Sequence, residues 1–288
     1  MHQLSLLEYA RLRDPTASDV EHVGRIAASV IAELCEEPPV DLDVVAAYRD
    51  INDIRVENLS VSGSLTPEAA GLVMRLRASD TEKRRRFTGF HEIGHTFQPG
   101  YREVQSLRCP DPSPRHRIAD DPEALADAAA AELLLPRAFF VPDLTETPFG
   151  LDGVLALGAR YEASIYATAL RFCRYWPEPT LLLTLQLGKR KADRDNPAVA
   201  PVLRVQSVHP RGPWPHVPRN KSAQAGGPLH RALQGEIVNE MTTLSDLQIN
   251  EGPFELSARN FQFRDQSGAI RDRVVALYRR TTLLRRHA

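Results

Sequence analysis

The sequence has few cysteines and almost no net charge. Its three cysteines, Cys35, Cys109 and Cys173, are widely separated and form no CxxC pair. This pattern does not support a zinc ribbon, a thioredoxin-like motif or a disulfide framework, and it is typical of a reducing compartment. The formal net charge is −1, so no overall field favours nucleic acid or an anionic membrane as a partner.

Long apolar runs are missing as well. No run approaches the ~20 apolar residues that cross a bilayer. Residues 1–14 lack the apolar core and the small-residue cleavage site of a signal peptide. The chain is 42% apolar and 25% charged, which is the balance of a globular protein that forms a core without disulfides. We therefore expect a cytoplasmic protein that binds no membrane.

The pattern of apolar residues and helix breakers predicts an α+β fold in three parts: residues 1–147, 148–178 and 179–288. The first is predicted to hold helices that begin at Ser18 and Asp41, strands within 51–64 and 72–76, a helix over about 80–97, a loop over 100–122 and an alanine-rich helix ending at 135–136. We expect the second strand to run antiparallel to the first. Either Asp120 or Asp121 is expected to cap the alanine-rich helix.

The other two parts have a simpler pattern. Residues 151–160 and 163–175 predict a helix-turn-helix-like pair with Ser164 as a cap. The last part is predicted to be a β-rich C-terminal domain of unknown role, with strands at 180–187, 202–208, 254–263 and 273–278 and a helix at 229–244.

The segment that points to chemistry is His91-Glu92-Ile93-Gly94-His95. Residues four apart lie on the same face of a helix, so the two imidazoles can bind one Zn²⁺ ion. Glu92 is turned away from such an ion but can reach a water molecule beside it, which suits a general base. Gly94 is costly inside a helix, and a closely packed second helix would explain it. The simpler alternative, two surface histidines beside a solvated glutamate, is disfavoured by the apolar residues on the same helix.

A catalytic zinc ion has three protein ligands and one open position. The third ligand is expected from the alanine-rich helix, where Glu123 and Asp127 share one face. Glu123 would bind the metal ion, and Asp127 would accept the outer N–H of His91 or His95. Three alternatives stay open: an acidic pair on a solvated face, Asp127 as the ligand, and Glu132 as a competing carboxylate.

The stretch Arg86-Phe87-Thr88 leading into His91–His95, followed by Glu123, Asp127 and the Leu-Leu-Leu-Pro segment at 133–136, resembles the ImmA/IrrE family of zinc metallopeptidases. The resemblance implies a zincin-like fold with the ligand arrangement of a gluzincin. It implies His91, His95 and Glu123 as zinc ligands and Glu92 as the catalytic base. It also implies site-specific cleavage of a protein substrate, a helix-turn-helix transcriptional repressor of stress, phage or mobile-element genes.

Several features outside the motif allow more than one interpretation. His116 and Tyr101 are candidates for a transition-state donor or a lid, although an ordinary loop histidine is the simpler interpretation of His116. A latent state with Cys109 as a metal ligand is a hypothesis based on its place in the same loop. The helix pair at 151–175 lacks a basic cluster at the start of its second helix, so packing or substrate docking is favoured over direct DNA binding. A regulatory protein that acts only by protein or DNA binding is the alternative function, and the oligomeric state is not predicted.

Overall fold

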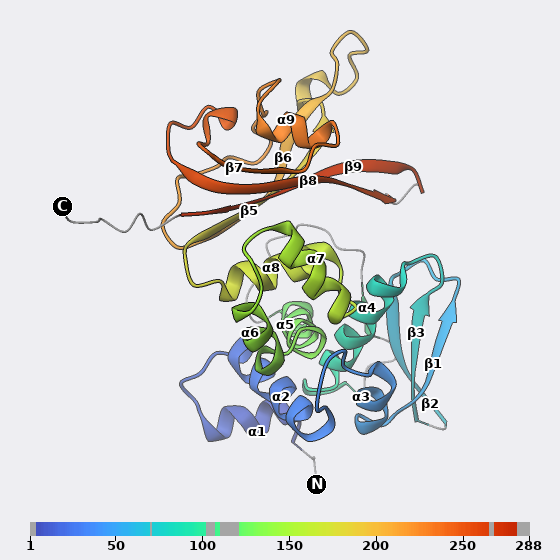
Figure 1. The fold of residues 1–288 in the computed structure, drawn as a ribbon. Helices are drawn as coiled ribbons and strands as arrows, with labels where there is room; N and C mark the ends of the chain where they lie inside the picture. The colour runs from blue at the N-terminus through green and yellow to red at the C-terminus, as the bar shows by residue number, and fades with distance from the viewer. Residues whose placement is uncertain (1–3, 70, 102–106, 110–120, 265–267, 281–288) are drawn as a thin grey trace, which may run out of the picture. The chain divides into compact units, whose positions relative to one another are not determined.

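The structure is a computed structural model that describes residues 4–69, 71–101, 107–109, 121–264 and 268–280, with 107–109 described by their backbone alone. It has the predicted α+β class and a β-rich C-terminal region (Figure 1). The chain forms two compact units, Met1–Thr145 with Leu157–Ala167, and Glu146–Ala156 with Thr168–Ala288. In the described ranges no helix is both long enough and apolar enough to cross a membrane. The division at residues 147 and 178 stays a prediction.

The first unit is built around two helices that carry most of the chemistry-bearing residues. Its elements are α1 (Leu6–Arg13), α2 (Asp19–Leu34), α3 (Leu42–Tyr48), β1 (Ile51–Glu57), β2 (Gly63–Glu68), β3 (Gly71–Arg77), α4 (Glu82–His95), β4 (Leu107–Cys109), α5 (Pro122–Leu134) and α6 (Arg137–Thr145). Helix α4 contacts strands β2 and β3 and also helix α5, which in turn contacts α2. Because α4 has neighbours on both sides, Phe90, Ile93 and Phe97 are fully buried.

The helix starts follow the predicted caps. Ser18 and Glu21 form a reciprocal capping box at the start of α2, so two backbone N–H groups that the helix cannot satisfy find acceptors. Asp41 caps α3 through the N–H groups of Asp43 and Val44. Of the two candidates for α5, Asp121 is the cap, with Pro122 at the first helical position.

The predicted pairing of the first two strands is wrong. The stretch 51–64 contains one whole strand, β1, and the start of a second, β2, and the sheet order is β1-β3-β2-β4. β3 runs parallel to β1 and antiparallel to β2. Alternation of apolar residues reports which face of a strand is buried, not which strand lies next to it. Because β2 lies between β1 and β3 in sequence, β3 runs parallel to β1, although the alternation of apolar residues in β1 and β3 is the same as in an antiparallel pair.

Short elements also lie where the sequence predicted none, β4 and α6 among them. The predicted loop over 100–122 contains β4, which pairs with β2 through Cys109 opposite Gly63. Three residues are too few to show a period, so only the neighbouring strand defines them. Helix α6 follows the predicted end of α5 because Pro136 acts as a helix start: its carbonyl accepts the N–H groups of Phe139 and Phe140.

The predicted helix pair is present as α7 (Leu151–Arg160) and α8 (Ile165–Tyr175). Ser164 accepts the backbone N–H of Ala167 at 3.2 Å, which confirms it as the cap of the second helix. The boundary between the two compact units passes through both helices.

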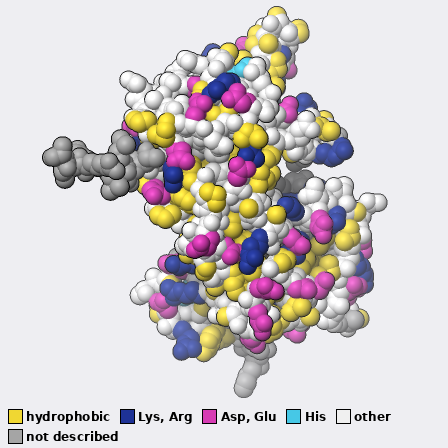
Figure 2. All heavy atoms as spheres, in the orientation of Figure 1, with side chains coloured by type: hydrophobic (Ala, Val, Ile, Leu, Met, Phe, Trp, Pro, Cys, Tyr) yellow, Lys and Arg dark blue, Asp and Glu magenta, His cyan; other side chains and the backbone are white. Residues whose placement is uncertain are grey.

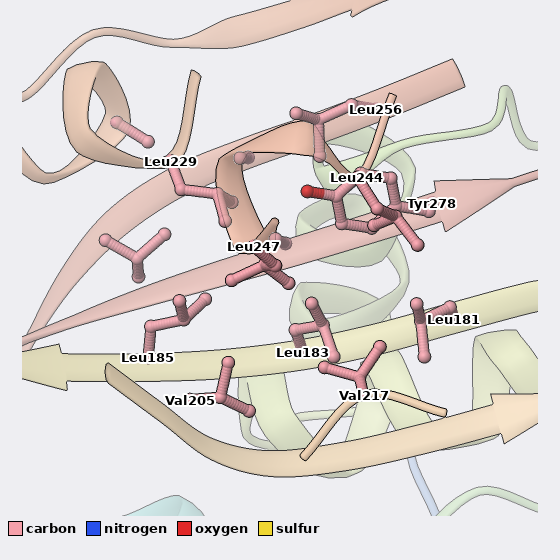
Figure 3. Close-up of a cluster of buried hydrophobic side chains, with 14 of the residues drawn as sticks. Leu181, Leu183, Leu185, Val205, Val217, Leu229, Leu244, Leu247, Leu256 and Tyr278 are labelled. Atoms are coloured by element: carbon pink, nitrogen blue, oxygen red, sulfur yellow. The ribbon is translucent and has the colours of Figure 1, made fainter. Parts of the chain in front are cut away.

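The second unit contains a five-stranded antiparallel sheet in the order β6-β5-β9-β8-β7. Its elements are β5 (Thr180–Gly188), η1 (Lys191–Asp193), β6 (Val202–Arg211), α9 (Pro228–Leu233), β7 (Val238–Thr242), η2 (Ser245–Leu247), β8 (Phe254–Arg264) and β9 (Ile270–Arg279). Leu181, Leu183 and Leu185 of β5 face Leu229 of α9 and Leu247 of η2 in a buried apolar cluster (Figure 3). This core explains why the four predicted strands are recognisable from their apolar runs.

The predicted helix over 229–244 is wrong beyond its first turns. Helix α9 ends at Leu233, and Gly235 follows with a φ of +98°, a conformation that stops a helix and that glycine adopts easily. The next residues form β7, which pairs with β8 through Val238 opposite Ala258. Pairing with a strand that lies later in the chain has overridden the local helical pattern.

Candidate metal centre

Helix α4 carries both histidines of the motif on one face. The helix begins after Thr81, whose side chain accepts the N–H of Arg84 at 3.3 Å. His91 and His95, one turn apart, are 0% and 2% exposed. Their ring centroids are 4.8 Å apart with an interplanar angle of 83°, and the two Nε2 atoms are 3.2 Å apart. Both imidazoles therefore present the same nitrogen to one point.

Helix α5 adds a carboxylate at that point. The cap Asp121 accepts the N–H of Glu123 at 3.1 Å, which places Glu123 in the first turn of α5. Its Oε2 is 3.3 Å from Nε2 of His91, and its Oε1 is 3.4 Å from Nε2 of His95. The ligand atoms of these three residues all lie within 4.8 Å of one another, so the group could hold a metal ion. Of the predicted metal ligands among the described residues, the structure thus brings His91, His95 and Glu123 together.

The two helices come close because the residues between them are small. A Cβ atom added to Gly94 would lie 2.9 Å from the carbonyl oxygen of Ala126 and 3.0 Å from Cβ of Ala129. The expected close approach of a second helix at Gly94 is confirmed. The alanines of α5 thus serve the site by allowing the backbone of α4 to approach.

Asp127 contacts the outer side of the site. Its Oδ1 is 2.9 Å from Nδ1 of His91. An ionised carboxylate can only accept, so Nδ1 of His91 is the donor. In a neutral imidazole this leaves the lone pair on Nε2, the nitrogen that faces His95 and Glu123. An outer carboxylate of this kind fixes the ring and its tautomer.

Comparison with known proteins bears on the same segment. Residues 41–172 match the family described as Peptidase_M78, the IrrE N-terminal-like domain. These residues form an IrrE N-terminal-like domain. The resemblance found in the sequence motifs is thereby confirmed, and both helices of the metal centre lie within the matched segment. The family description indicates a peptidase-like role for the domain, and the group of His91, His95 and Glu123 could hold a metal ion.

The remaining comparisons concern the whole chain. A Mycobacterium tuberculosis transcriptional regulator is similar in structure, with a TM-score of 0.58 and 14% sequence identity, over 96% of this chain and 79% of that chain. At this identity the likeness shows the fold alone. No curated protein matches the chain.

The protonation states of the site suit metal binding. Burial acts to raise the pKa of Glu123, but hydrogen bonds with His91 and His95 outweigh it and lower the pKa to about 2. Burial lowers the pKa of His95 below its ordinary value, although the contact with Glu123 acts in the opposite direction. At neutral pH the carboxylate is then ionised and His95 is neutral. Both are the forms that a metal ion requires.

Glu92 of α4 is fully buried, and its carboxylate lies beside Gly63 of strand β2. A Cβ atom added to Gly63 of β2 would lie 3.0 Å from Oε1 of Glu92 and 2.4 Å from Cγ2 of Thr88. Only a residue without a side chain leaves the Glu92 carboxylate in this position. From the sequence, Gly63 predicts only a turn after the alternating residues before it, whereas the structure places it at the start of β2. No local pattern could have linked it to Glu92, because the contact depends on how the sheet packs on α4.

The other candidates are less well placed or lie outside the described residues. Glu132 of α5 accepts the backbone N–H of Arg137 at 2.8 Å, a structural contact at the start of α6. Tyr101 is half-buried in the turn after α4, and its role as a transition-state donor or lid stays a prediction. His116 and the side chain of Cys109 lie outside the described residues, so neither hypothesis about them is tested.

Proposed function

We propose that this protein is a zinc-dependent endopeptidase in which His91, His95 and Glu123 hold the metal ion and Glu92 is the general base. The observation that carries the proposal is the convergence of two imidazole nitrogens and one carboxylate within 4.8 Å, with a buried carboxylate at the next position on the same helix. The IrrE N-terminal-like family of residues 41–172 supports the same assignment.

The donor set fits zinc. Two histidine nitrogens and one glutamate oxygen are a ligand combination of catalytic zinc sites, which keep a further position open for water or substrate. The Glu123 side chain is 25% exposed, so the group can be reached from solvent on its side. A bound zinc ion would supply Lewis acidity that polarises a scissile carbonyl and makes water more acidic. Asp127 would hold His91 in the tautomer that binding needs.

Glu92 would move the proton. As general base, its carboxylate takes a proton from the attacking water molecule and then delivers it to the leaving amine nitrogen. Gly63 leaves just enough room for the Glu92 carboxylate beside β2. The close packing of α4 on β2 limits the conformations that the Glu92 side chain can adopt. The same burial keeps bulk water away from the side of the carboxylate that faces the sheet.

For the substrate we propose an exposed or flexible segment of a helix-turn-helix transcriptional repressor. Its cleavage would release stress, phage or mobile-element genes from repression. The proposal rests on the motif resemblance, and the fold likeness to a transcriptional regulator is compatible with a role in transcription. The reaction would be the hydrolysis of one peptide bond, with one water molecule consumed and two peptide ends formed.

The test is co-expression of the chain with candidate repressors, followed by detection of the fragments. Glu92→Gln keeps the size of the side chain and removes the base, so cleavage should fall by about 10²–10⁴-fold while zinc content stays at one ion per chain. The matched control is Glu82→Gln, an exposed residue in the first turn of the same helix. Control protein should cleave like the wild type. Undiminished cleavage by Glu92→Gln would refute the assignment, as would purified wild-type protein without stoichiometric zinc.

A regulator that acts by contact alone is the second candidate. Its support is the likeness to a protein named as a transcriptional regulator, which extends over 96% of this chain. This function predicts that Glu92→Gln leaves both the association with the repressor and the transcriptional response unchanged. The peptidase predicts that association persists while the response is lost. The same variant therefore separates the two functions.

A further inference from the structure

The second unit contains a basic cavity that has no part in the proposed peptidase site. It has a volume of about 420 Å³ and lies where the β5–β6 connection meets β6. Its lining residues are Lys189, Arg190, Lys191, Arg194, Arg204 and Asn220. Five of these six side chains are cationic and none is acidic. Most protein cavities that bind small molecules are instead lined mainly by apolar groups.

The cationic side chains of the cavity have no carboxylate in ion-pair contact within the described part of the chain. None of the five cationic side chains makes an ion pair with a described residue. Lys189 donates its Nζ to the backbone carbonyl of Asn196 at 2.7 Å, a contact with no charge to offset its own. Several other arginines of the same unit do have carboxylate partners, as Arg231 does with Glu236 and Glu240.

Arg204 makes the cavity more than a charged surface loop. It lies on β6 and is only 8% exposed. Its Nε donates to the carbonyl of Gly188 at 3.1 Å, and its Nη1 donates to the carbonyl of Asn220 at 2.8 Å. Its third nitrogen, Nη2, makes no hydrogen bond with a described residue and is not among the buried unsatisfied atoms, so it keeps contact with solvent. Two backbone carbonyls thus fix the guanidinium in place without neutralising its charge, and Nη2 is left to donate to an anionic ligand.

We propose that this cavity binds the oligophosphate group of a small molecule, such as a diphosphate or triphosphate chain. A guanidinium with a free edge matches two phosphate oxygens, and the surrounding lysine and arginine side chains supply further charge-assisted hydrogen bonds. A chain of two or three phosphates carries several negative charges, which suits a lining with five cationic side chains. A single carboxylate would leave most of them unpaired.

The alternative of a nucleic-acid backbone fits the surface less well. Nucleic-acid sites follow the backbone as an extended basic stripe. Over the face of the molecule drawn in Figure 2, Lys and Arg side chains are interspersed with Asp and Glu side chains rather than gathered in a stripe. The formal net charge of −1 agrees with this distribution. The concentration of positive charge around a recessed arginine therefore favours a compact ligand.

The experiment is titration calorimetry of the full chain with inorganic pyrophosphate, ADP and adenosine at constant ionic strength. Pyrophosphate and ADP should each bind with one site per chain, and adenosine should not bind. Equal affinities would mean that the cavity reads only the phosphate chain, whereas tighter ADP binding would mean that a nucleotide is preferred. Binding of adenosine alone, or tighter binding of a short DNA duplex than of pyrophosphate, would overturn the proposal.

Variants locate the binding in this cavity. Arg190 and Lys191 are exposed in the connecting segment, so Arg190→Glu with Lys191→Glu should keep the fold and weaken pyrophosphate by about a hundredfold. The matched control, Arg13→Glu with Arg174→Glu, makes the same change in net charge at exposed positions outside the cavity and should bind like the wild type. Arg204→Gln tests the recessed guanidinium, with circular dichroism to verify folding. Equal binding by the cavity variant and the control would refute the assignment.

Discussion

Gly94→Ala is the sharpest test of the idea that the metal centre depends on the close contact of α4 and α5. The added Cβ would lie 2.9 Å from the carbonyl oxygen and 3.0 Å from Cα of Ala126, and 3.0 Å from Cβ of Ala129. Ordinary contacts between such atoms are about 3.5–4.0 Å. Two of the three neighbours are backbone atoms, which cannot move aside by changing a rotamer. The helices must therefore separate by about 0.5 Å.

Two free-energy terms oppose each other. Alanine in place of glycine stabilises a helix interior by about 1 kcal/mol. Overpacking of a close helix contact costs about 1–3 kcal/mol. The net expectation is a loss of about 0–2 kcal/mol in the free energy of unfolding. Zinc affinity should fall more clearly, because ligand distances must be met to within about 0.2 Å and the proposed ligands His91 and His95 would move relative to Glu123.

The matched control is Gly24→Ala in α2, where an added Cβ meets no atom within 4 Å. That variant gains the helix propensity of alanine without any overpacking, so its free energy of unfolding should exceed that of the wild type by about 1 kcal/mol. Urea unfolding gives the two stabilities, and competition with a chromogenic chelator gives the zinc affinities. If Gly94→Ala is as stable as Gly24→Ala and binds zinc like the wild type, the contact between α4 and α5 does not set the ligand geometry.

Two further predictions concern single carboxylates. Asp127→Ala should weaken zinc binding by about 10–100-fold, because His91 loses the acceptor for its Nδ1, and Asp127→Asn, which keeps an oxygen, should lose less; chelator competition measures both. Asp246→Asn should stabilise the protein at neutral pH. Burial raises the pKa of Asp246, so the folded state binds the proton more tightly than the unfolded state does. The stability of the wild type therefore falls as the pH rises through the pKa of Asp246 in the folded state. The asparagine oxygen can still accept the N–H of Leu229, and the gain should vanish below about pH 4, where both states are protonated. A difference in urea unfolding that does not vary with pH would contradict this reasoning.

The parts of the fold that the sequence predicts are those decided within a few residues. Ser18 and Asp121 cap helices because their side chains reach the N–H groups of the next turn. The spacing of His91 and His95 places both on one face for the same local reason. The apolar run of β5 marks a strand because this central strand is buried along most of its length.

The failures arise where a distant segment decides the local structure. The residues of β7 have a helical pattern, yet Gly235 ends α9 before them. The residues after Gly235 then pair with β8 as strand β7. The parallel alignment of β1 with β3 similarly depends on β2 lying on the far side of β3. Neither outcome can be read from the period of a single segment, because a sheet is completed by partners that the segment itself does not specify.

The candidate metal centre depends both on local helix geometry and on contacts between distant segments. Only the residues placed by local helix geometry can be predicted from the sequence. His91, Glu92 and His95 follow from one helical turn, and Glu123 and Asp127 from another. Their meeting depends on Gly94, Ala126 and Ala129, whose small size already hints at a close helix contact. Gly63 gives no such hint, because its effect on Glu92 arises only when β2 packs on α4. Gly63→Ala should therefore displace Glu92, the proposed general base, while leaving the three proposed ligands in place. Loss of peptide cleavage with unchanged zinc affinity is the expected result, and loss of both would mean that β2 supports the whole site rather than Glu92 alone.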